Sequence, residues 1–387
     1  MEILAKLLAV NYTWDASHTH AEYAATGRYV VANNAVTGIK VHERADGTLD
    51  VFLAVPRWRP GVPATLNRLV EVDGESVLAP WPTWEMQAEG NCSAIQYVQS
   101  MEIVPNSEMW VLDVGRRNFL NDAPSSKPDN SCPPKLMIID LQTSRVSTVY
   151  EFPDEVASHS ESFLNDIVVD VPRQIAFISD AGTGALVSYD RLTGRSRRFS
   201  DRTTQNEPDF DFTIDGVHYG NKIFTTPADG IALLPDRSRV VYCALQGSTL
   251  WSVSSHALAD VASSTAEIQR TQLRHGRKAS ASDGLSFDCA GTLWFGGLTT
   301  DALYKWTYEA NRSVGLADVV ATDRERLHWI DTFAFDSSGR LYATTNKLDT
   351  YFERTMNFTP GGSPNFQVVR FDVGRRSYML PCVRGAG

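Results

Sequence analysis

The chain has 387 residues, of which 46 are acidic and 36 are basic, so its formal net charge is −10 at pH 7. Phosphate binding needs a concentrated face of Lys and Arg, so this charge balance argues against nucleic acid as a partner. No stretch approaches the roughly 20 apolar residues of a transmembrane helix, and we predict no membrane span. The one basic cluster, Arg195, Arg197 and Arg198, lies between turn residues, where we expect a solvated loop.

The N-terminal stretch from Met1 to Val10 is apolar but short, and it carries Glu2. It lacks the basic region and the small-residue cleavage site of a signal peptide. Two interpretations stay open: a first structural segment after a removed signal, or a remnant of that signal. We favour the first.

A repeat runs through the rest of the chain. In each copy a small or acidic residue opens a short apolar strand, a turn follows, and a second β-rich strand comes next. The copies start at Thr37, Ser100, Asn165, Ala228, Ser282 and Ile330, roughly 50 to 65 residues apart. Each copy has room for four short strands, which is one blade of a β-propeller. We therefore predict an all-β, six-bladed propeller with four-stranded blades over residues 1–387, in which residues 1–34 help to close the last blade.

The turns and the scarcity of helical patterns support this fold. Hairpin signals such as Ala45-Asp46-Gly47 and Ser337-Ser338-Gly339 separate β-branched and aromatic runs. Only Ser254 to Val261 is typical of a short helix. A doubly wound α/β fold needs a helix after most strands, and the sequence does not provide them.

The repeat also predicts an acid-rich rim. The residue that opens each inner strand should lie at one mouth of the central channel, which places Asp166, Asp229, Asp283 and Asp331 around one rim with Glu102 nearby. These carboxylates could cap the strand-opening turns, bind a divalent cation, or bind and polarise a small molecule. Clustered carboxylates raise one another's pKa, which favours a role in proton transfer.

Other candidate side chains lie close to the strand openers. Phe163 precedes Asn165, and His328 and Trp329 precede Asp331. Arg57, beside Trp58, could pair with an anionic or carbonyl oxygen of a ligand, or it could be an ion-pair partner that locks two blades together. The candidate catalytic residues are thus Glu102, Asp166, Asp229, Asp283, Asp331 and His328. The candidate ligand-binding residues are Arg57, Trp58, Phe163, Asn165, Trp329, Thr332, Asn346 and Tyr351.

Motifs for covalent or cofactor-dependent chemistry are missing. The sequence contains no GxSxG elbow, no HExxH helix and no phosphate-binding loop. We expect no cofactor and a small molecule as the binding partner, with calcium as the open alternative.

Cysteines and sequons indicate a secretory route. Sequons stand at Asn11, Asn91, Asn311 and Asn357, and we predict glycosylation there. Of the five cysteines, Cys243 and Cys289 lie in apolar strand-like runs, where we expect buried thiols or turn residues. Cys92 and Cys132 lie in loops, where a disulfide is easier to place.

Several segments resemble the yellow / major royal jelly protein family. Val55 to Val70 (VPRWRPGVPATLNRLV) resembles the first-blade signature, and MWVLDVGRR followed by CPPKLMIIDL resembles the second blade. The likeness continues through DGIALLP and ASASDGLSFDCAGTLWFGG to RLYATTNKL, and so covers nearly the whole chain from about Trp14. It implies a six-bladed propeller in the secretory pathway or outside the cell.

The resemblance also implies roles for individual residues. Cys132 stands at the cysteine of the family's CPP motif and Cys92 at an upstream cysteine, which implies a disulfide between them. Asn346 resembles an Asn that contacts the ligand in amine-binding salivary members. Leu348 stands where an aromatic residue often follows that Asn.

A second resemblance concerns the Asp-Gly strand openers, which are similar to those of gluconolactonase-type propellers. That pattern implies a divalent metal on Asn165, Asp229 and Asp283. Its blade-one Glu has no counterpart, because Thr37-Gly38 stands there. A calcium-dependent lactonase is therefore the weaker hypothesis, and we predict that the protein does not require metal for activity.

The family likeness implies two activities that need neither a nucleophile nor a cofactor. Insect relatives act on dopachrome, and similar fungal propellers direct hetero-Diels–Alder additions. We therefore expect a propeller that holds an electron-poor aromatic or quinoid compound in its central funnel and steers an isomerisation or a cycloaddition. The alternatives are a non-catalytic carrier of aromatic or biogenic amines, the lactonase, and a structural or nutritive secreted protein.

Overall fold

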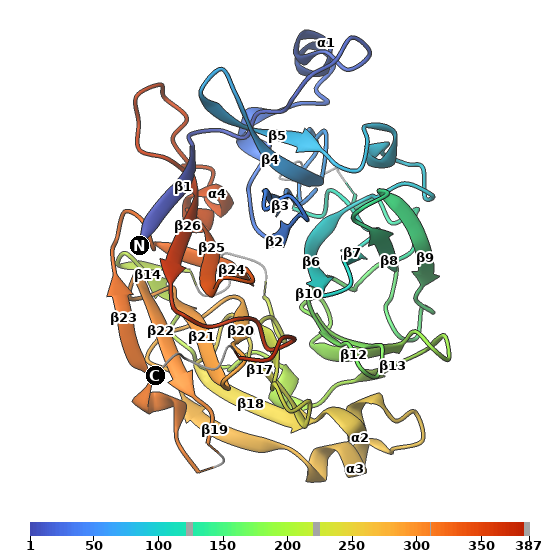
Figure 1. The fold of residues 1–387 in the computed structure, drawn as a ribbon, viewed down its shortest axis with the longest axis vertical. Helices are drawn as coiled ribbons and strands as arrows, with labels where there is room; N and C mark the ends of the chain where they lie inside the picture. Colours follow the sequence, from blue (N-terminus) through green and yellow to red (C-terminus); the bar gives the residue numbers. More distant parts are fainter. Residues whose placement is uncertain (121–126, 220–224, 310, 383–387) are drawn as a thin grey trace.

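The computed structural model describes residues 1–120, 127–219, 225–309 and 311–382. Within these ranges, six four-stranded antiparallel sheets surround one central axis (Figure 1). The prediction of a six-bladed propeller with four-stranded blades is confirmed.

The blades follow one another in chain order, and in blades 1 to 5 the strands run from the inner to the outer edge. Blade 1 contains β2 (Ile39–Glu43), β3 (Leu49–Ala54), β4 (Leu66–Val72) and β5 (Glu75–Pro80). Blade 2 contains β6 (Val98–Val104), β7 (Glu108–Asp113), β8 (Lys135–Asp140) and β9 (Arg145–Glu151). Blade 3 contains β10 (Leu164–Asp170), β11 (Ile175–Asp180), β12 (Ala185–Asp190) and β13 (Arg195–Phe199).

The second half repeats this plan with additions between the strands. Blade 4 contains β16 (Ile231–Leu233), β17 (Arg239–Tyr242), β18 (Thr249–Ser254) and β19 (Leu273–Arg277). Blade 5 contains β20 (Leu285–Phe287), β21 (Thr292–Gly297), β22 (Ala302–Thr307) and β23 (Asp318–Thr322). The additions are the helices α1 (His20–Ala25), α2 (Ser255–Ala259), α3 (Thr265–Arg270) and α4 (Leu348–Phe352), and the hairpin of β14 (Thr213–Ile214) and β15 (Val217–His218).

Both ends of the chain contribute to blade 6. Its inner strands are β24 (Trp329–Phe335), β25 (Arg340–Asn346) and β26 (Phe366–Asp372). Its outermost strand is β1 (Glu2–Leu7), which pairs antiparallel with β26. The N-terminal strand therefore closes the ring of blades, and no edge of β26 is left open.

Strand position within a blade determines its burial pattern. Every residue of the inner strand β10 is buried, whereas the outer strand β9 alternates between half-buried and exposed residues. Inner strands pack between two neighbouring blades and so must be apolar or hydrogen-bonded on both faces.

Arg195, Arg197 and Arg198 belong to the outer strand β13, so the expectation of a loop there was wrong. Their side chains face the surface or the rim of a blade, which a strand at the outer edge permits.

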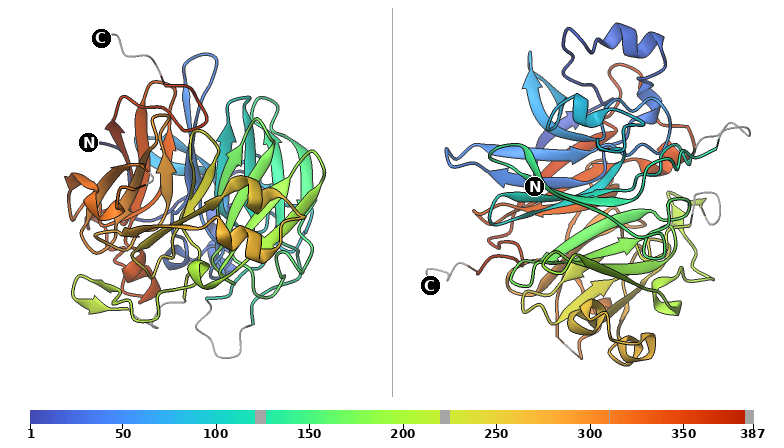
Figure 2. Two further views of the ribbon diagram at one scale, coloured as in Figure 1. Left: turned by 90° about the horizontal axis from the view of Figure 1, so that it is seen from below. Right: turned by 90° about the vertical axis from the view of Figure 1, so that its right-hand side faces the viewer.

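The C-terminal segment leaves β26 and crosses one face of the propeller toward its centre (Figure 1). There the main-chain N–H of Tyr378 donates to the carbonyl of Phe287 in blade 5. The phenol oxygen of Tyr378 accepts from the N–H of Val169 in blade 3, at 2.8 Å. In the left view of Figure 2 this segment lies on the upper face, and the β14–β15 hairpin lies on the lower face.

Two disulfides fasten loops to this frame. The predicted bond between Cys92 and Cys132 is confirmed. Cys289 lies in the turn that follows β20, as one of its two expectations had it, but it forms a second disulfide with Cys382, so the alternative of a buried thiol was wrong. Its partner lies 93 residues further along the chain, and the repeat alone gives no reason for the two to meet. Cys243 is a buried free thiol, as expected.

No helix in the described ranges is long and apolar enough to cross a membrane.

Candidate functional site

The inner strands approach one another closely where they begin. A Cβ added at Gly284 would lie 2.5 Å from the main-chain oxygen of Asp331, and one added at Gly230 would lie 2.4 Å from that of Asp283. Only glycine permits this approach. The residues just before these glycines therefore form one layer around the channel.

Polar side chains of this layer bond to one another around the ring. The amide Nδ2 of Asn165 donates to Oδ1 of Asp229 at 2.9 Å. Asp229 and Asp283 are joined by a side-chain hydrogen bond, which requires a proton on one of the two carboxyls. On the other side of the ring, Nδ2 of Asn346 donates to Oδ2 of Asp331 at 2.9 Å. We call Asn165, Asp229, Asp283, Asp331 and Asn346 the polar ring.

Burial sets the protonation of the polar ring. Removal from water raises the pKa of Asp229, Asp283 and Asp331 well above that of an ordinary Asp, and repulsion between neighbouring carboxyls raises it further. Asp229 and Asp331 are buried, whereas Asp283 keeps part of its surface accessible. Asp283 is thus the more accessible residue of the pair.

Asp166 and Thr332 lie next to the polar ring. Oδ1 of Asp166 accepts from Oγ of Ser100 at 2.8 Å and from the N–H of Ile167 at 2.8 Å. The hydroxyl of Thr332 donates to Oδ1 of Asp331 at 2.9 Å. Both side chains therefore make hydrogen bonds that stabilise the first residues of the inner strands.

Glu102 lies deeper in the channel than the predicted rim. It pairs with the ammonium of Lys40, with 3.5 Å between Oε2 and Nζ. Lys40 was missed by the sequence analysis. The first copy of the repeat carries Lys40 two residues after Gly38, and the second carries Glu102 two residues after Ser100, so aligning the copies would have placed them at one level.

Aromatic side chains surround the mouth at the polar ring. Tyr97 and Phe119 stack with their ring centres 6.0 Å apart, and Phe163 lies 5.6 Å from Phe119. Trp329 lies 6.2 Å from Phe212, which leads into the β14–β15 hairpin. Phe163 stands just before β10, as expected, and Trp329 is the first residue of β24, whereas Phe119 lies between β7 and β8. Tyr97 was missed, although it too stands just before an inner strand.

The predicted residues of the first blade are fully buried. The guanidinium of Arg57 donates to five main-chain carbonyls, those of Val62, Pro63, Gln87, Ile95 and Gln96. This arrangement matches the second of its two expected roles, which is to lock blade 1 to blade 2. Trp58 packs against Tyr351, with 5.6 Å between ring centres, and the hydroxyl of Tyr351 donates to the carbonyl of Asn33.

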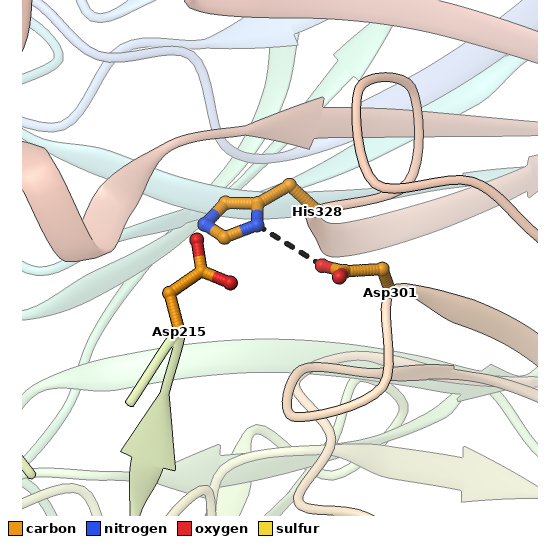
Figure 3. A group of neighbouring side chains, drawn as sticks. All are labelled: Asp215, Asp301 and His328. Carbon is orange, nitrogen blue, oxygen red and sulfur yellow. Dashed lines mark hydrogen bonds and ion pairs between the residues drawn. The ribbon is translucent and has the colours of Figure 1, made fainter. Parts of the chain in front are cut away.

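His328 belongs to a network of carboxylates beside the same mouth (Figure 3). Its Nδ1 lies 3.0 Å from Oδ1 of Asp301, and its Nε2 lies 3.1 Å from Oδ1 of Asp349. Asp215, at the tip of the β14–β15 hairpin, faces the same imidazole and pairs with Arg324 at 2.8 Å. Burial alone would lower the pKa of His328, but the surrounding carboxylates raise it above the ordinary value.

Two sets of side chains could hold a cation. Asn165, Asp229 and Asp283 come together as the lactonase pattern implies, but Asn165 turns its amide N–H, which cannot ligate a metal, toward Asp229. Asp215, Asp301 and His328 offer ligand atoms within 4.8 Å of one another. In the present contacts these atoms form an ion-pair network.

The fold and this site define a six-bladed propeller whose central channel carries hydrogen-bonded carboxyls at one mouth and an aromatic wall above them. The family model for major royal jelly protein matches residues 97–382. The chain belongs to the major royal jelly protein family.

Two curated relatives from fruit flies match part of the chain. Protein yellow of Drosophila guanche is 28% identical over 65% of this chain and 44% of its own length. Dopaminechrome tautomerase of Drosophila melanogaster is 26% identical over 57% of this chain and 47% of its own length. The chain thus spans less than half the length of these relatives.

Solved structures support the fold alone. A luciferin-regenerating enzyme matches with a TM-score of 0.51 and 12% identity, over 93% of this chain and 96% of that one. A calcium-binding regucalcin from Agrobacterium tumefaciens also matches with a TM-score of 0.51, at 13% identity, over 90% of this chain and 93% of that one.

Proposed function

We propose that this chain is a cofactor-independent isomerase that binds an electron-poor quinoid compound at the polar ring and moves a proton from its carbon to its oxygen. The observation that carries the proposal is the hydrogen bond between the side chains of Asp229 and Asp283, two buried carboxyls whose pKa values burial raises. A tautomerase needs one base and one acid close together, and such a pair supplies both near neutral pH.

The proposed reaction balances within the pair. In the proposed step Asp229 acts as the ionised member and takes a proton from a carbon next to the quinoid ring. Asp283 gives its proton to a quinoid oxygen as the ring becomes aromatic. The proton then returns from Asp229 to Asp283 along the hydrogen bond that joins them.

Neighbouring groups suit this substrate class. The rings of Tyr97 and Phe163 pack with Phe119, which keeps part of its surface accessible and could contact a flat, electron-poor ring. Trp329 donates to Asp283 and so fixes the direction of its carboxyl. The relative named dopaminechrome tautomerase adds support for an isomerisation of this kind.

The same site could steer a Diels–Alder or hetero-Diels–Alder cycloaddition. A hydrogen bond from Asp283 to a carbonyl oxygen lowers the energy of a polar transition state, and the aromatic wall restricts the face from which an alkene approaches. This reaction uses Asp283 as a hydrogen-bond donor and needs no base.

A second candidate function, the binding of aromatic or biogenic amines without catalysis, is favoured by the carboxyls of the ring. An ammonium in the channel would hold Asp229 or Asp331 in its ionised form, and nearby aromatic faces would add cation–π attraction.

We further propose that the protein matures in the secretory pathway. Two disulfides suit an oxidising compartment. Asn11, Asn91, Asn311 and Asn357 are all exposed, as glycosylation requires.

The test compares three reactions on one preparation. The protein is incubated with dopaminechrome, with a quinone-methide precursor plus a humulene-type alkene, and with biogenic amines in a titration. Loss of the dopaminechrome absorbance faster than the uncatalysed background supports the isomerase, and a stereoselective adduct supports the cycloaddition. Sub-micromolar amine binding without any change in product distribution would replace both with the carrier.

A further inference from the structure

A cavity lies at the opposite mouth of the channel from the polar ring. It has a volume of about 290 Å³ and is lined by the far ends of inner strands and by the C-terminal segment. Lys40 and Glu102 line its polar part, and Phe333, Tyr378, Met379 and Leu380 line its apolar part. Its volume is at the low end of the range found for small-molecule sites.

The wall formed by the C-terminal segment is fixed in place. The Cys289–Cys382 disulfide joins the segment to blade 5. Tyr378 is buried and bonds to blades 3 and 5, through Val169 and Phe287. Because both sides of the segment are anchored, the cavity exists before any ligand arrives, which lowers the entropic cost of binding.

The Lys40–Glu102 pair has hydrogen-bonding capacity to spare. An ammonium has three donor hydrogens, and the described residues supply two acceptors, the carbonyl of Phe333 at 3.0 Å and Oε2 of Glu102 at 3.5 Å. Oε1 of Glu102 accepts from the N–H of Ile103 at 3.0 Å, and each carboxylate oxygen can accept two bonds. The pair therefore offers one donor and at least one acceptor toward the cavity.

Charge around the cavity selects against anions. Glu43 and Asp336 also line it, so an anion would approach three carboxyl groups, including Glu102. A neutral ligand avoids this penalty, and unlike an ion it leaves the buried pair of Lys40 and Glu102 intact.

We propose that this cavity is a second ligand site, which binds an uncharged one- or two-ring aromatic molecule carrying a hydroxyl group next to a carbonyl group. The carbonyl oxygen accepts from Lys40, and the hydroxyl donates to Glu102. The ring body packs against Phe333, Met379 and Leu380. This site is separate from the polar ring and does not depend on the function proposed there.

The test uses 2-acetyl-1-naphthol, a neutral hydroxyaryl ketone, as the probe. Binding is measured by calorimetry with the full chain, and the position of the probe is read from the methyl resonance of Met379 in protein labelled at methionine. We expect saturable binding at one site and a shift of the Met379 signal that follows the same isotherm.

Variants locate the site. Leu380→Trp fills the cavity from the half-buried C-terminal segment and should weaken binding by about tenfold or more. Leu192→Trp makes the same change at an exposed position on blade 3 and should bind the probe as the native chain does. Asp283→Asn, at the other mouth, should also bind normally, which separates this site from the polar ring.

Chemical controls test the ligand class. The methyl ether of the probe lacks the hydroxyl donor, and 1-hydroxy-2-naphthoic acid is anionic, so both should bind more weakly than the probe. No binding of the probe, equal binding by the Leu380→Trp variant, or loss of binding in the Asp283→Asn variant would each overturn the proposal. None of these results bears on isomerase activity at the polar ring.

Discussion

The indole Nε1 of Trp329 donates a hydrogen bond of 2.8 Å to Oδ2 of Asp283. Trp329 begins the inner strand of blade 6, and Asp283 stands just before that of blade 5, so the bond joins two neighbouring blades. It holds the carboxyl of Asp283, the more accessible residue of the Asp229–Asp283 pair, in a fixed direction. The predictions for the site follow from this arrangement.

Replacing Asp283 with Asn removes the transferable proton but keeps the size of the side chain. If the pair acts as acid and base, turnover of dopaminechrome should fall by about 10²- to 10⁴-fold. The matched control is Asp318→Asn on the exposed outer strand of blade 5, which should retain full activity. Full activity in the Asp283→Asn variant, measured by the dopaminechrome absorbance, would rule out the proton-transfer mechanism.

Acidification should stabilise the polar ring. Burial raises the pKa of Asp331 well above its value in the unfolded chain, so the folded state binds the proton more tightly. This contribution to the free energy of unfolding grows as the pH falls through the folded pKa toward about 4, the pKa of an unfolded Asp. In Asp331→Asn this part of the pH dependence should disappear, as measured by urea unfolding between neutral pH and pH 5. An unchanged slope would mean that Asp331 has an ordinary pKa.

The His328 network should lose stability at the alkaline side. The carboxylates of Asp349, Asp301 and Asp215 raise the pKa of His328, so the protonated imidazole stabilises the folded state. That stability is fully present below about pH 6.5, the pKa of an unfolded His, and is lost as the pH rises through the higher folded pKa. Thermal unfolding of His328→Gln from pH 6 to 9 should therefore depend less on pH than that of the native chain. A parallel curve would contradict the raised pKa.

The two disulfides should differ in how much they stabilise the fold and in which segment they anchor. The Cys289–Cys382 bond closes a longer loop than the Cys92–Cys132 bond, 93 against 40 residues. Loop-closure entropy then gives it the larger stabilisation, at most about 4–5 kcal/mol. A Cys289→Ser/Cys382→Ser variant should show a lower unfolding midpoint and release the C-terminal segment to limited proteolysis. The Cys92→Ser/Cys132→Ser variant is the control, and cleavage of the C-terminal segment there as well would contradict this assignment.

Chelation should leave the protein active. Asn165 presents an N–H toward Asp229, and the blade-one acid of the lactonase pattern is replaced by Thr37-Gly38. Treatment with EDTA should therefore change neither the melting temperature nor the turnover of dopaminechrome. A large fall in either that calcium restores would establish the metal-dependent alternative.

The sequence determined the architecture because the signal for it is local and repeated. Six copies of one strand–turn–strand pattern predict six blades, and Asp229 and Asp283 hold the same place in their copies, so their meeting at one mouth follows from the repeat. The pairing of Cys92 with Cys132 followed from a family likeness, which carries tertiary information that spacing does not.

Tertiary structure alone decided the contacts between distant segments. Cys289 meets Cys382 because the C-terminal segment leaves blade 6 and crosses to blade 5, and no periodicity encodes that path. The same crossing forms one wall of the cavity beside Lys40 and Glu102. Arg57 shows what the sequence could not predict for a single residue. From its place beside Trp58, its guanidinium could face either a ligand or the protein interior. The structure shows it in the interior, where it donates to five main-chain carbonyls. A strand pattern depends on neighbours in sequence, whereas the partners of a buried polar group are set by how the blades pack.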